Sequence, residues 1–143
     1  MVRSGDHIVF YGSLRPPYET RRRIGIDAMV RHVAPARLRG ALHDLGSYPA
    51  FVHGVGEVAG DLFEVVDDRL AAVLDPFEGF DPADPSGSPY VREIIDVVDP
   101  RLPAWIYRYM GRPPPGSMVP GGHWVALLIE KSRDGTLGPR DGP

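Results

Sequence analysis

The 143-residue sequence contains no cysteine. This absence excludes a disulfide framework, a thiolate zinc site and a cysteine nucleophile, and it fits a reducing compartment. No stretch approaches the ~20 apolar residues that a membrane-spanning helix needs, and the polar start at residues 1–6 lacks the apolar segment of a signal peptide. We therefore expect a cytoplasmic protein without a membrane partner.

The sequence also lacks an excess of basic residues, since its formal net charge is −3. Nucleic-acid-binding domains usually carry a basic surplus on one face. The cluster Arg21-Arg22-Arg23 has Tyr18 nearby but no series of aromatic residues on which the bases of a single strand could stack. We therefore expect no nucleic-acid partner.

Common motifs for phosphate, dinucleotide, metal and serine-nucleophile chemistry are absent. The sequence has no G-x-x-x-x-G-K, G-x-G-x-x-G, H-E-x-x-H or G-x-S-x-G segment. Its histidines are scattered, with no pair at close ligand spacing: His7, His32, His43, His53 and His123. These absences predict no metal site and no cofactor.

The composition is that of one globular domain. Apolar residues make up 43% of the chain and charged residues 24%. The 17 glycines and 16 prolines follow no period, which indicates many turns rather than a repeat. We place the domain at residues 1–130 and a flexible tail at 131–143, where no apolar period remains.

The pattern of apolar residues predicts about six short strands with one or two helices. The clearest helix is expected over 67–77, and an arginine-rich helix over 19–31 is weakened by Gly25. Strands are expected at 7–11, 36–45, 55–66, 91–98 and 104–110, the last two as a hairpin, with loops or turns at 13–17, 46–49, 80–89 and 111–122. The short apolar element at 123–130 fits either type. This pattern predicts an α+β domain with a partly closed sheet.

A carboxylate, Glu78, lies at the end of the clearest helix, close to Phe77 and Phe80. The C-terminus of a helix disfavours an acid. An apolar pocket raises a carboxyl pKa toward the range that suits proton transfer near neutral pH. Glu78 is therefore a candidate general acid/base; the alternative is a solvated acid beside a glycine that ends the helix.

The exit of the first strand, Tyr11-Gly12-Ser13-Leu14, is a second candidate site. Gly12 permits a sharp backbone turn, and successive amides in such a turn can bind an anion such as a substrate carboxylate. The alternative is a plain connection from strand to loop.

Tyr90 and Arg92 form a third candidate, at the start of the strand that follows the proline-rich loop. Because they are two residues apart on a strand, their side chains share a face. The alternative is a half-buried tyrosine with a surface arginine.

The order of these segments resembles the gamma-glutamylcyclotransferase-like family. The resemblance extends from about residue 7 to residue 110 and rests on five ordered blocks, with a sixth, P-G-G-H-W, at 120–124. The five are Y-G-S-L-R at 11–15, G-A-L-x-D-L-G-x-Y-P-A at 40–50, G-x-L-F-E-V at 60–65, L-D-x-x-E-G-F at 74–80 and Y-V-R-E at 90–93. The resemblance implies a small mixed β-barrel with flanking helices.

The resemblance also implies a site. It makes Glu78 the catalytic acid/base, and it makes the loop of Tyr11, Gly12, Ser13 and Leu14 the holder of the substrate's α-carboxylate and amino end. Tyr90 and Tyr107 match family tyrosines at the substrate. The outer half of the substrate is expected to face Tyr48 and its neighbours and the loop at 81–89.

The reaction implied by the resemblance is intramolecular and needs no metal or cofactor. The α-amino group of a γ-glutamyl unit attacks its own γ-carbonyl, 5-oxoproline forms, and the γ-linked amine leaves. Glu78 would move the proton. The stretch from Glu78 to Tyr90 is longer than in compact members of the family, which bears on the substrate rather than on the chemistry.

A non-catalytic binding or accessory domain on the same fold is the alternative, because members that lack the glutamate serve as such modules. Glu78 is present here, which favours the enzyme. The expected partner is a small γ-glutamyl compound, either an amino acid, an amine or a carrier-bound intermediate. The sequence gives no prediction of oligomeric state.

Overall fold

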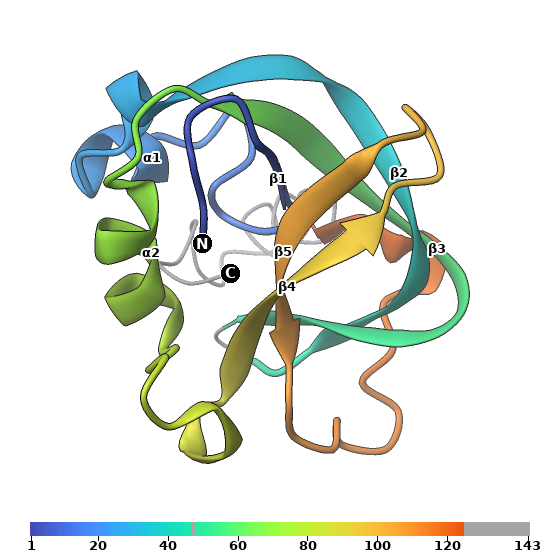
Figure 1. Ribbon diagram of the computed structural model, residues 1–143. Helices are drawn as coiled ribbons and strands as arrows, with labels where there is room; N and C mark the ends of the chain where they lie inside the picture. Colours follow the sequence, from blue (N-terminus) through green and yellow to red (C-terminus); the bar gives the residue numbers. More distant parts are fainter. Residues whose placement is uncertain (47, 125–143) are drawn as a thin grey trace.

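The computed structural model describes residues 1–46 and 48–124, and its centre is a strongly curved five-stranded mixed sheet (Figure 1). The strand order is β2-β3-β1-β5-β4. The elements are β1 (His7–Phe10), α1 (Thr20–Arg23), β2 (Val30–Asp44), β3 (Pro49–Val65), α2 (Leu70–Glu78), β4 (Tyr90–Asp96) and β5 (Pro103–Tyr109), with short 3-10 turns at Asp27–Met29, Pro85–Gly87 and Pro120–Gly122.

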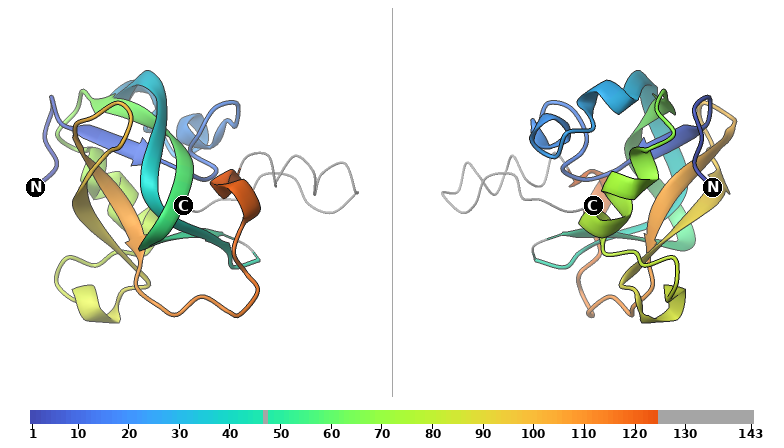
Figure 2. Two further views of the ribbon diagram at one scale, coloured as in Figure 1. Left: turned by 90° about the vertical axis from the view of Figure 1, so that its right-hand side faces the viewer. Right: turned by 60° about the vertical axis from the view of Figure 1, so that its left-hand side comes forward.

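The sheet is made of two hairpins joined through β1. Strands β2 and β3 pair antiparallel and bend around the molecule (Figure 2). Strands β4 and β5 form the expected hairpin, and β1 joins the two by pairing antiparallel with β3 and parallel with β5 at Ile8 and Trp105. An isolated bridge between Arg37 and Asp99 brings the end of the second hairpin back to β2. The predicted α+β fold with a mixed sheet is confirmed, but the sheet does not close into a complete barrel.

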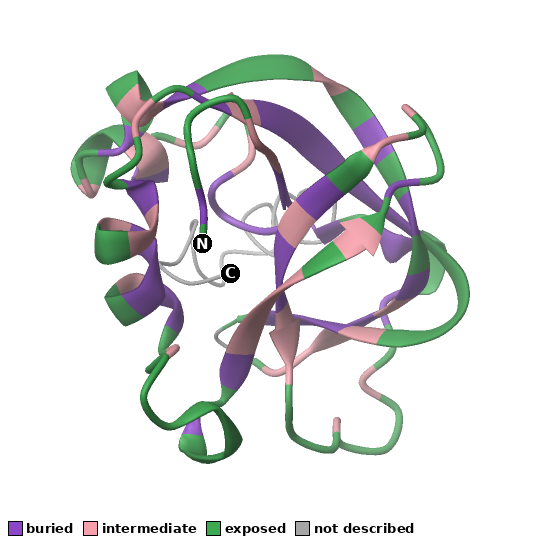
Figure 3. Cartoon of the chain, in the orientation of Figure 1, coloured by how far each residue is buried: buried purple, intermediate pink, exposed green. Residues whose placement is uncertain are grey.

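The sheet separates two apolar clusters. Successive residues of β1 alternate between them: Val9 faces the cluster inside the curved sheet, whereas Ile8 and Phe10 face the cluster under α2. Figure 3 shows the buried residues of α2 on the side that is turned toward the sheet. The candidate site lies where these two clusters meet.

The buried row of α2 contains a carboxylate. Leu70, Leu74 and Glu78 are spaced four residues apart and all are buried, together with Asp75. Gly79 ends the helix with a φ of 81°, in the left-handed region that favours glycine. The predicted helix is confirmed, although its first turn begins three residues later than expected.

The predicted arginine-rich helix at 19–31 is wrong in its length. Helix α1 is a single turn, because Gly25 adopts a φ of 81° and breaks it, and β2 has begun by Val30. Strands β2 and β3 both start earlier than predicted. Strand β2 contains Pro35, which has no N–H to donate and is tolerated because β2 is an edge strand.

Some expectations lie outside the described residues. These are the tail at 131–143, the greater part of the element at 123–130, and Ser47 in the predicted turn at 46–49. Within residues 1–46 and 48–124, no helix is both long and apolar enough to cross a membrane.

Candidate active site

The Glu78 carboxyl is the most unusual polar group of the molecule. The residue is only 4% exposed, and its Oε2 is buried without a hydrogen-bond partner, a state found at no other buried side-chain atom of the described residues. Burial raises the pKa of Glu78 well above its ordinary value, and the negative charge of Asp75 raises it further. Glu78 therefore binds a proton more tightly in the folded protein than an exposed glutamate does.

Asp75 lies one helical turn before Glu78 and is tightly paired. It accepts hydrogen bonds from Arg92 through Nε at 2.9 Å and Nη2 at 3.1 Å, and from the Tyr107 hydroxyl at 2.6 Å. The Arg92 guanidinium in turn lies over the rings of Phe80 and Trp105, at 5.5 and 5.1 Å from their centres. The alternative of a surface arginine is therefore wrong: Arg92 is a largely buried partner of the helix, with 13% of its side chain exposed.

Three tyrosines surround the Glu78 carboxyl. The Tyr11 hydroxyl donates to the carbonyl oxygen of Tyr107 at 2.6 Å, and the Tyr90 hydroxyl donates to that of Pro49 at 2.9 Å. Burial raises the pKa of Tyr11, Tyr90 and Tyr107, and the charge of Glu78 contributes to each increase. All three rings are therefore neutral neighbours of the acid.

The strand exit at residues 11–14 is held by hydrogen bonds from Arg15 and Arg21. The Arg15 N–H donates to the Gly12 carbonyl at 3.1 Å, and Arg21 Nη1 donates to the Leu14 carbonyl at 2.6 Å. Arg15 Nε also donates to Asp61 Oδ2 at 2.6 Å. None of residues 11–14 has a positive φ. The segment is a turn, as expected, but Gly12 does not use the left-handed backbone that only glycine adopts readily.

Two cavities meet at Glu78. The smaller is enclosed by the carboxyl and the strand exit, and its lining includes Tyr11, Gly12 and Leu14. The larger has a volume of about 290 Å³. It is lined by Leu45, Tyr48, Pro76, Phe77, Glu78, Gly79, Pro89, Tyr90 and Tyr109.

The structure brings most of the predicted site residues together. Six line one of these cavities: Tyr11, Gly12, Leu14, Tyr48, Glu78 and Tyr90. Tyr107 reaches the site through Asp75, and Ser13 is buried in the strand exit. Of the proline-rich loop at 80–89, only Pro89 lines the larger cavity.

Asp75 was not among the predicted site residues. The signal was present, because an acid three residues before Glu78 on a helix must lie on the same face. Tyr109 was also missed; its ring lies 5.3 Å from that of Tyr90, and it follows Tyr107 at the strand spacing of two.

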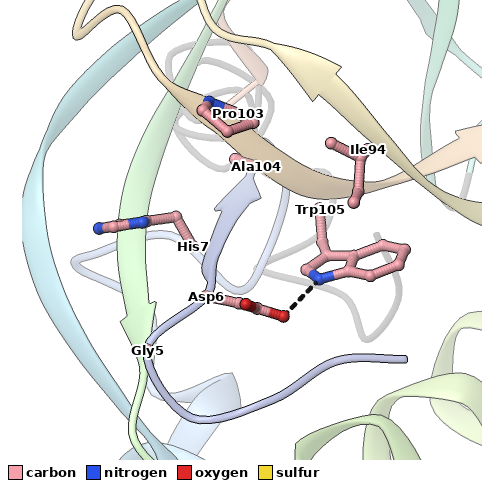
Figure 4. Close-up of a pocket in the computed structure, with 7 residues that line it drawn as sticks. All are labelled: Gly5, Asp6, His7, Ile94, Pro103, Ala104 and Trp105. Atoms are coloured by element: carbon pink, nitrogen blue, oxygen red, sulfur yellow. Dashed lines mark hydrogen bonds between the residues drawn. The ribbon is translucent and has the colours of Figure 1, made fainter.

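A separate cavity of about 180 Å³ contains none of the predicted site residues. Its lining includes Asp6, His7 and Ile94, and Trp105 Nε1 donates to Asp6 Oδ2 at 3.0 Å across it (Figure 4). In the part of the chain that the structure describes, no three His, Asp or Glu side chains gather where they could hold a metal ion.

Comparisons with known proteins agree on one family. The sequence profile described as Gamma-glutamyl cyclotransferase, AIG2-like, matches residues 8–126. A curated protein of Vibrio cholerae named "Putative gamma-glutamylcyclotransferase" is 31% identical over 120 residues, which cover 83% of this chain and 96% of that protein.

Solved structures share the fold. An uncharacterized protein from Pyrococcus horikoshii is similar with a TM-score of 0.66 at 15% identity, covering 90% of this chain and 97% of that chain. The Escherichia coli protein ytfP is similar with a TM-score of 0.59 at 26% identity, covering 85% and 97%. Because the profile spans most of the fold and the curated relative matches along nearly its whole length, this chain belongs to the Gamma-glutamyl cyclotransferase, AIG2-like family.

Proposed function

We propose that the protein is a cyclotransferase that releases 5-oxoproline from a γ-glutamyl compound, with Glu78 as general acid/base. The observation that carries the proposal is the buried Glu78 carboxyl, whose Oε2 is unpaired within the described residues and which lines two cavities. Leaving a buried polar atom unpaired costs about 1–3 kcal/mol. Strongly perturbed acids in cavities are typical of catalytic sites.

The reaction is an internal acyl transfer. The α-amino nitrogen attacks the γ-carbonyl carbon and closes the ring, while the bond from that carbon to the leaving nitrogen breaks. Two protons leave the attacking nitrogen, which arrives as an ammonium, and two reach the leaving nitrogen, which departs as an ammonium. Glu78 passes them one at a time, so that it ends the cycle unchanged.

The raised pKa of Glu78 suits this task. An α-ammonium loses its proton near pH ~8, whereas an ordinary glutamate is protonated only below pH ~4.3. An ordinary glutamate would therefore be a weak base toward the ammonium. Raising the pKa of Glu78 brings donor and acceptor closer together, which lowers the cost of the first proton transfer.

We assign the glutamyl head to the strand exit and the leaving group to the larger cavity. The N–H groups of Gly12 and Ser13 are the candidate donors for the α-carboxylate. Because Arg15 and Arg21 already hold this turn, little new backbone is ordered when substrate binds, and amine and carbonyl meet in a reactive geometry. Tyr48, 42% exposed at the 290 Å³ cavity, is the candidate contact for the leaving group.

A substrate panel tests the function. The protein is incubated with γ-glutamyl amino acids and γ-glutamyl amines, and 5-oxoproline is measured by mass spectrometry, with Glu78→Gln as the matched control. We expect 5-oxoproline from at least one compound with the native protein and a strong reduction with the variant. Binding of γ-glutamyl compounds without any 5-oxoproline would instead identify a non-catalytic binding domain.

A further inference from the structure

Two buried carboxylates occupy one turn of α2. Asp75 is 7% exposed and Glu78 is 4% exposed, and they are three residues apart on the same face. Two acids placed this closely in an apolar region are not both ionised without strong compensation. The hydrogen bonds show which of the two is compensated.

The compensation is entirely on Asp75. Its carboxylate receives two hydrogen bonds from the planar Arg92 fork and one from Tyr107, whereas Glu78 Oε2 receives none from any described residue. Bidentate arginine–carboxylate pairs are strong and fixed in geometry. Asp75 is thus a negative charge with a defined position, and Glu78 is the neighbour that feels it.

The other groups around Glu78 carry no competing charge. Tyr11 faces it from the exit of β1, Tyr90 from β4 and Tyr107 from β5, and burial keeps all three hydroxyls protonated. Tyr48 and Tyr109 line the larger cavity. The Arg92 cation is paired with Asp75 through two hydrogen bonds and therefore offsets part of the Asp75 charge. Among the charged groups of the described residues, Asp75 is the one whose charge adds to burial in raising the pKa of Glu78.

We propose that Asp75 is a positioning residue for the reaction: its carboxylate, locked by Arg92 and Tyr107, is the fixed negative charge that makes Glu78 a strong enough base to take the proton of the substrate ammonium. This inference rests on the proposed function for its consequence in catalysis. Its physical content, the coupling between Asp75 and Glu78, can be measured without any substrate.

The experiment titrates Glu78 in the unliganded protein. The infrared absorption of its protonated carboxyl is isolated as the difference between each protein and the same protein carrying Glu78→Gln. In Asp75→Asn the charge is removed and the shape is kept, so we expect Glu78 to ionise at lower pH than in the native protein. Where the protein turns over a γ-glutamyl substrate, the acidic limb of the kcat/KM profile moves to lower pH by the same amount.

Two further variants keep the test decisive. Asp75→Asn leaves Arg92 buried without its partner, which is destabilising; the double variant Asp75→Asn/Arg92→Gln removes both charges and is expected to shift Glu78 in the same direction. Asp61→Asn is the matched control, because Asp61 is an equally buried aspartate paired with Arg15. We expect no change in the titration of Glu78 in this control.

The outcomes separate the two proposals. An unchanged Glu78 titration in folded Asp75 variants, or an equal change in Asp61→Asn, overturns the coupling whether or not 5-oxoproline is formed. A lower ionisation range in the Asp75 variants alone supports the coupling. Absence of 5-oxoproline from the native protein, in contrast, contradicts the proposed function and leaves the titration result standing.

Discussion

Asp61 and Asp75 are two buried aspartates that have similar partners but lie in different parts of the molecule. Each is 7% exposed and each pairs with an arginine, Asp61 with Arg15 and Asp75 with Arg92. The third partner differs: His32 Nε2 lies 2.9 Å from Asp61 Oδ1, whereas a tyrosine hydroxyl donates to Asp75. The first pair fastens the strand exit to β3, and the second fastens α2 to the β4–β5 hairpin.

What differs is the next neighbour. No carboxyl with a raised pKa lies beside Asp61 among the described residues, whereas Glu78 follows Asp75 by one helical turn. A buried ion pair therefore acquires a chemical role from the group beside it rather than from its own geometry. In this molecule one pair holds the proposed binding loop, and the other also sets the basicity of the proposed catalytic acid.

The largest expected effect comes from removing the Glu78 carboxyl, which lies beside the Asp75–Arg92 pair only. Glu78→Gln keeps the shape of the side chain but cannot accept a proton, so turnover of a confirmed substrate should fall by ~10²–10⁴-fold. The melting temperature should hold or rise, because no ionisable group is then kept in the apolar site. Near-native turnover in this variant, measured as 5-oxoproline, would show that another group moves the proton.

Breaking either ion pair should cost similar stability. Asp61→Ala and Asp75→Ala each leave a largely buried arginine without its partner, which costs up to about 3–5 kcal/mol. Chemical denaturation followed by tryptophan fluorescence measures both losses. A small loss for one variant would mean that its arginine reaches water and that the two pairs are not equivalent structurally.

The pH dependence of stability should identify Glu78 as well. Its pKa is raised by folding, so the folded state keeps a proton that the unfolded chain releases above pH ~4.3. The contribution of Glu78 to the free energy of unfolding is therefore greatest below that pH. Above it, the contribution decreases by about 1.4 kcal/mol per pH unit until the pKa of Glu78 in the folded state is reached. The difference in unfolding free energy between Glu78→Gln and the native protein should grow with pH over this window. A difference that stays constant would contradict a raised pKa.

The smallest expected effect comes from the Arg15–Asp61 pair at the strand exit. Arg15→Met removes the contact between the strand exit and Asp61 but leaves Arg21 on the Leu14 carbonyl. The loop loses part of its order, so KM should rise by ~10-fold, about 1.4 kcal/mol, while kcat changes little. Arg69→Met is the control, because Arg69 pairs with Asp67 on the exposed surface. A fall in kcat at unchanged KM would place Arg15 with the chemistry.

Local features of the fold were readable from the sequence. Patterns within a few residues predict the buried row of α2, the β4–β5 hairpin and the turn after β1. Over such short stretches, backbone preference and side-chain period act directly. The lengths of α1 and β2 did not follow, because Gly25 ends α1 after one turn and the extent of β2 depends on how far it pairs with β3.

The sequence predicted individual residues of the candidate site but not the hydrogen bonds that connect them. Glu78 and the strand exit follow from their local sequence, yet the hydrogen bond from Tyr11 to Tyr107 joins residues 96 apart in the chain. The pairing of Arg92 with Asp75 likewise depends on how β4 lies against α2. Such contacts are decided by the packing of whole elements, which a single sequence does not display.

The buried row of α2 also has an evolutionary consequence. Position 78 continues the line of Leu70 and Leu74, so the packing of the domain favours an apolar residue there. Replacing the glutamate by leucine or methionine would remove the unpaired buried oxygen and the proposed proton transfer, while the ion pair of Arg15 with Asp61 still holds the strand exit. One substitution on the buried row of α2 would thus turn the proposed enzyme into a binding module without a change of fold.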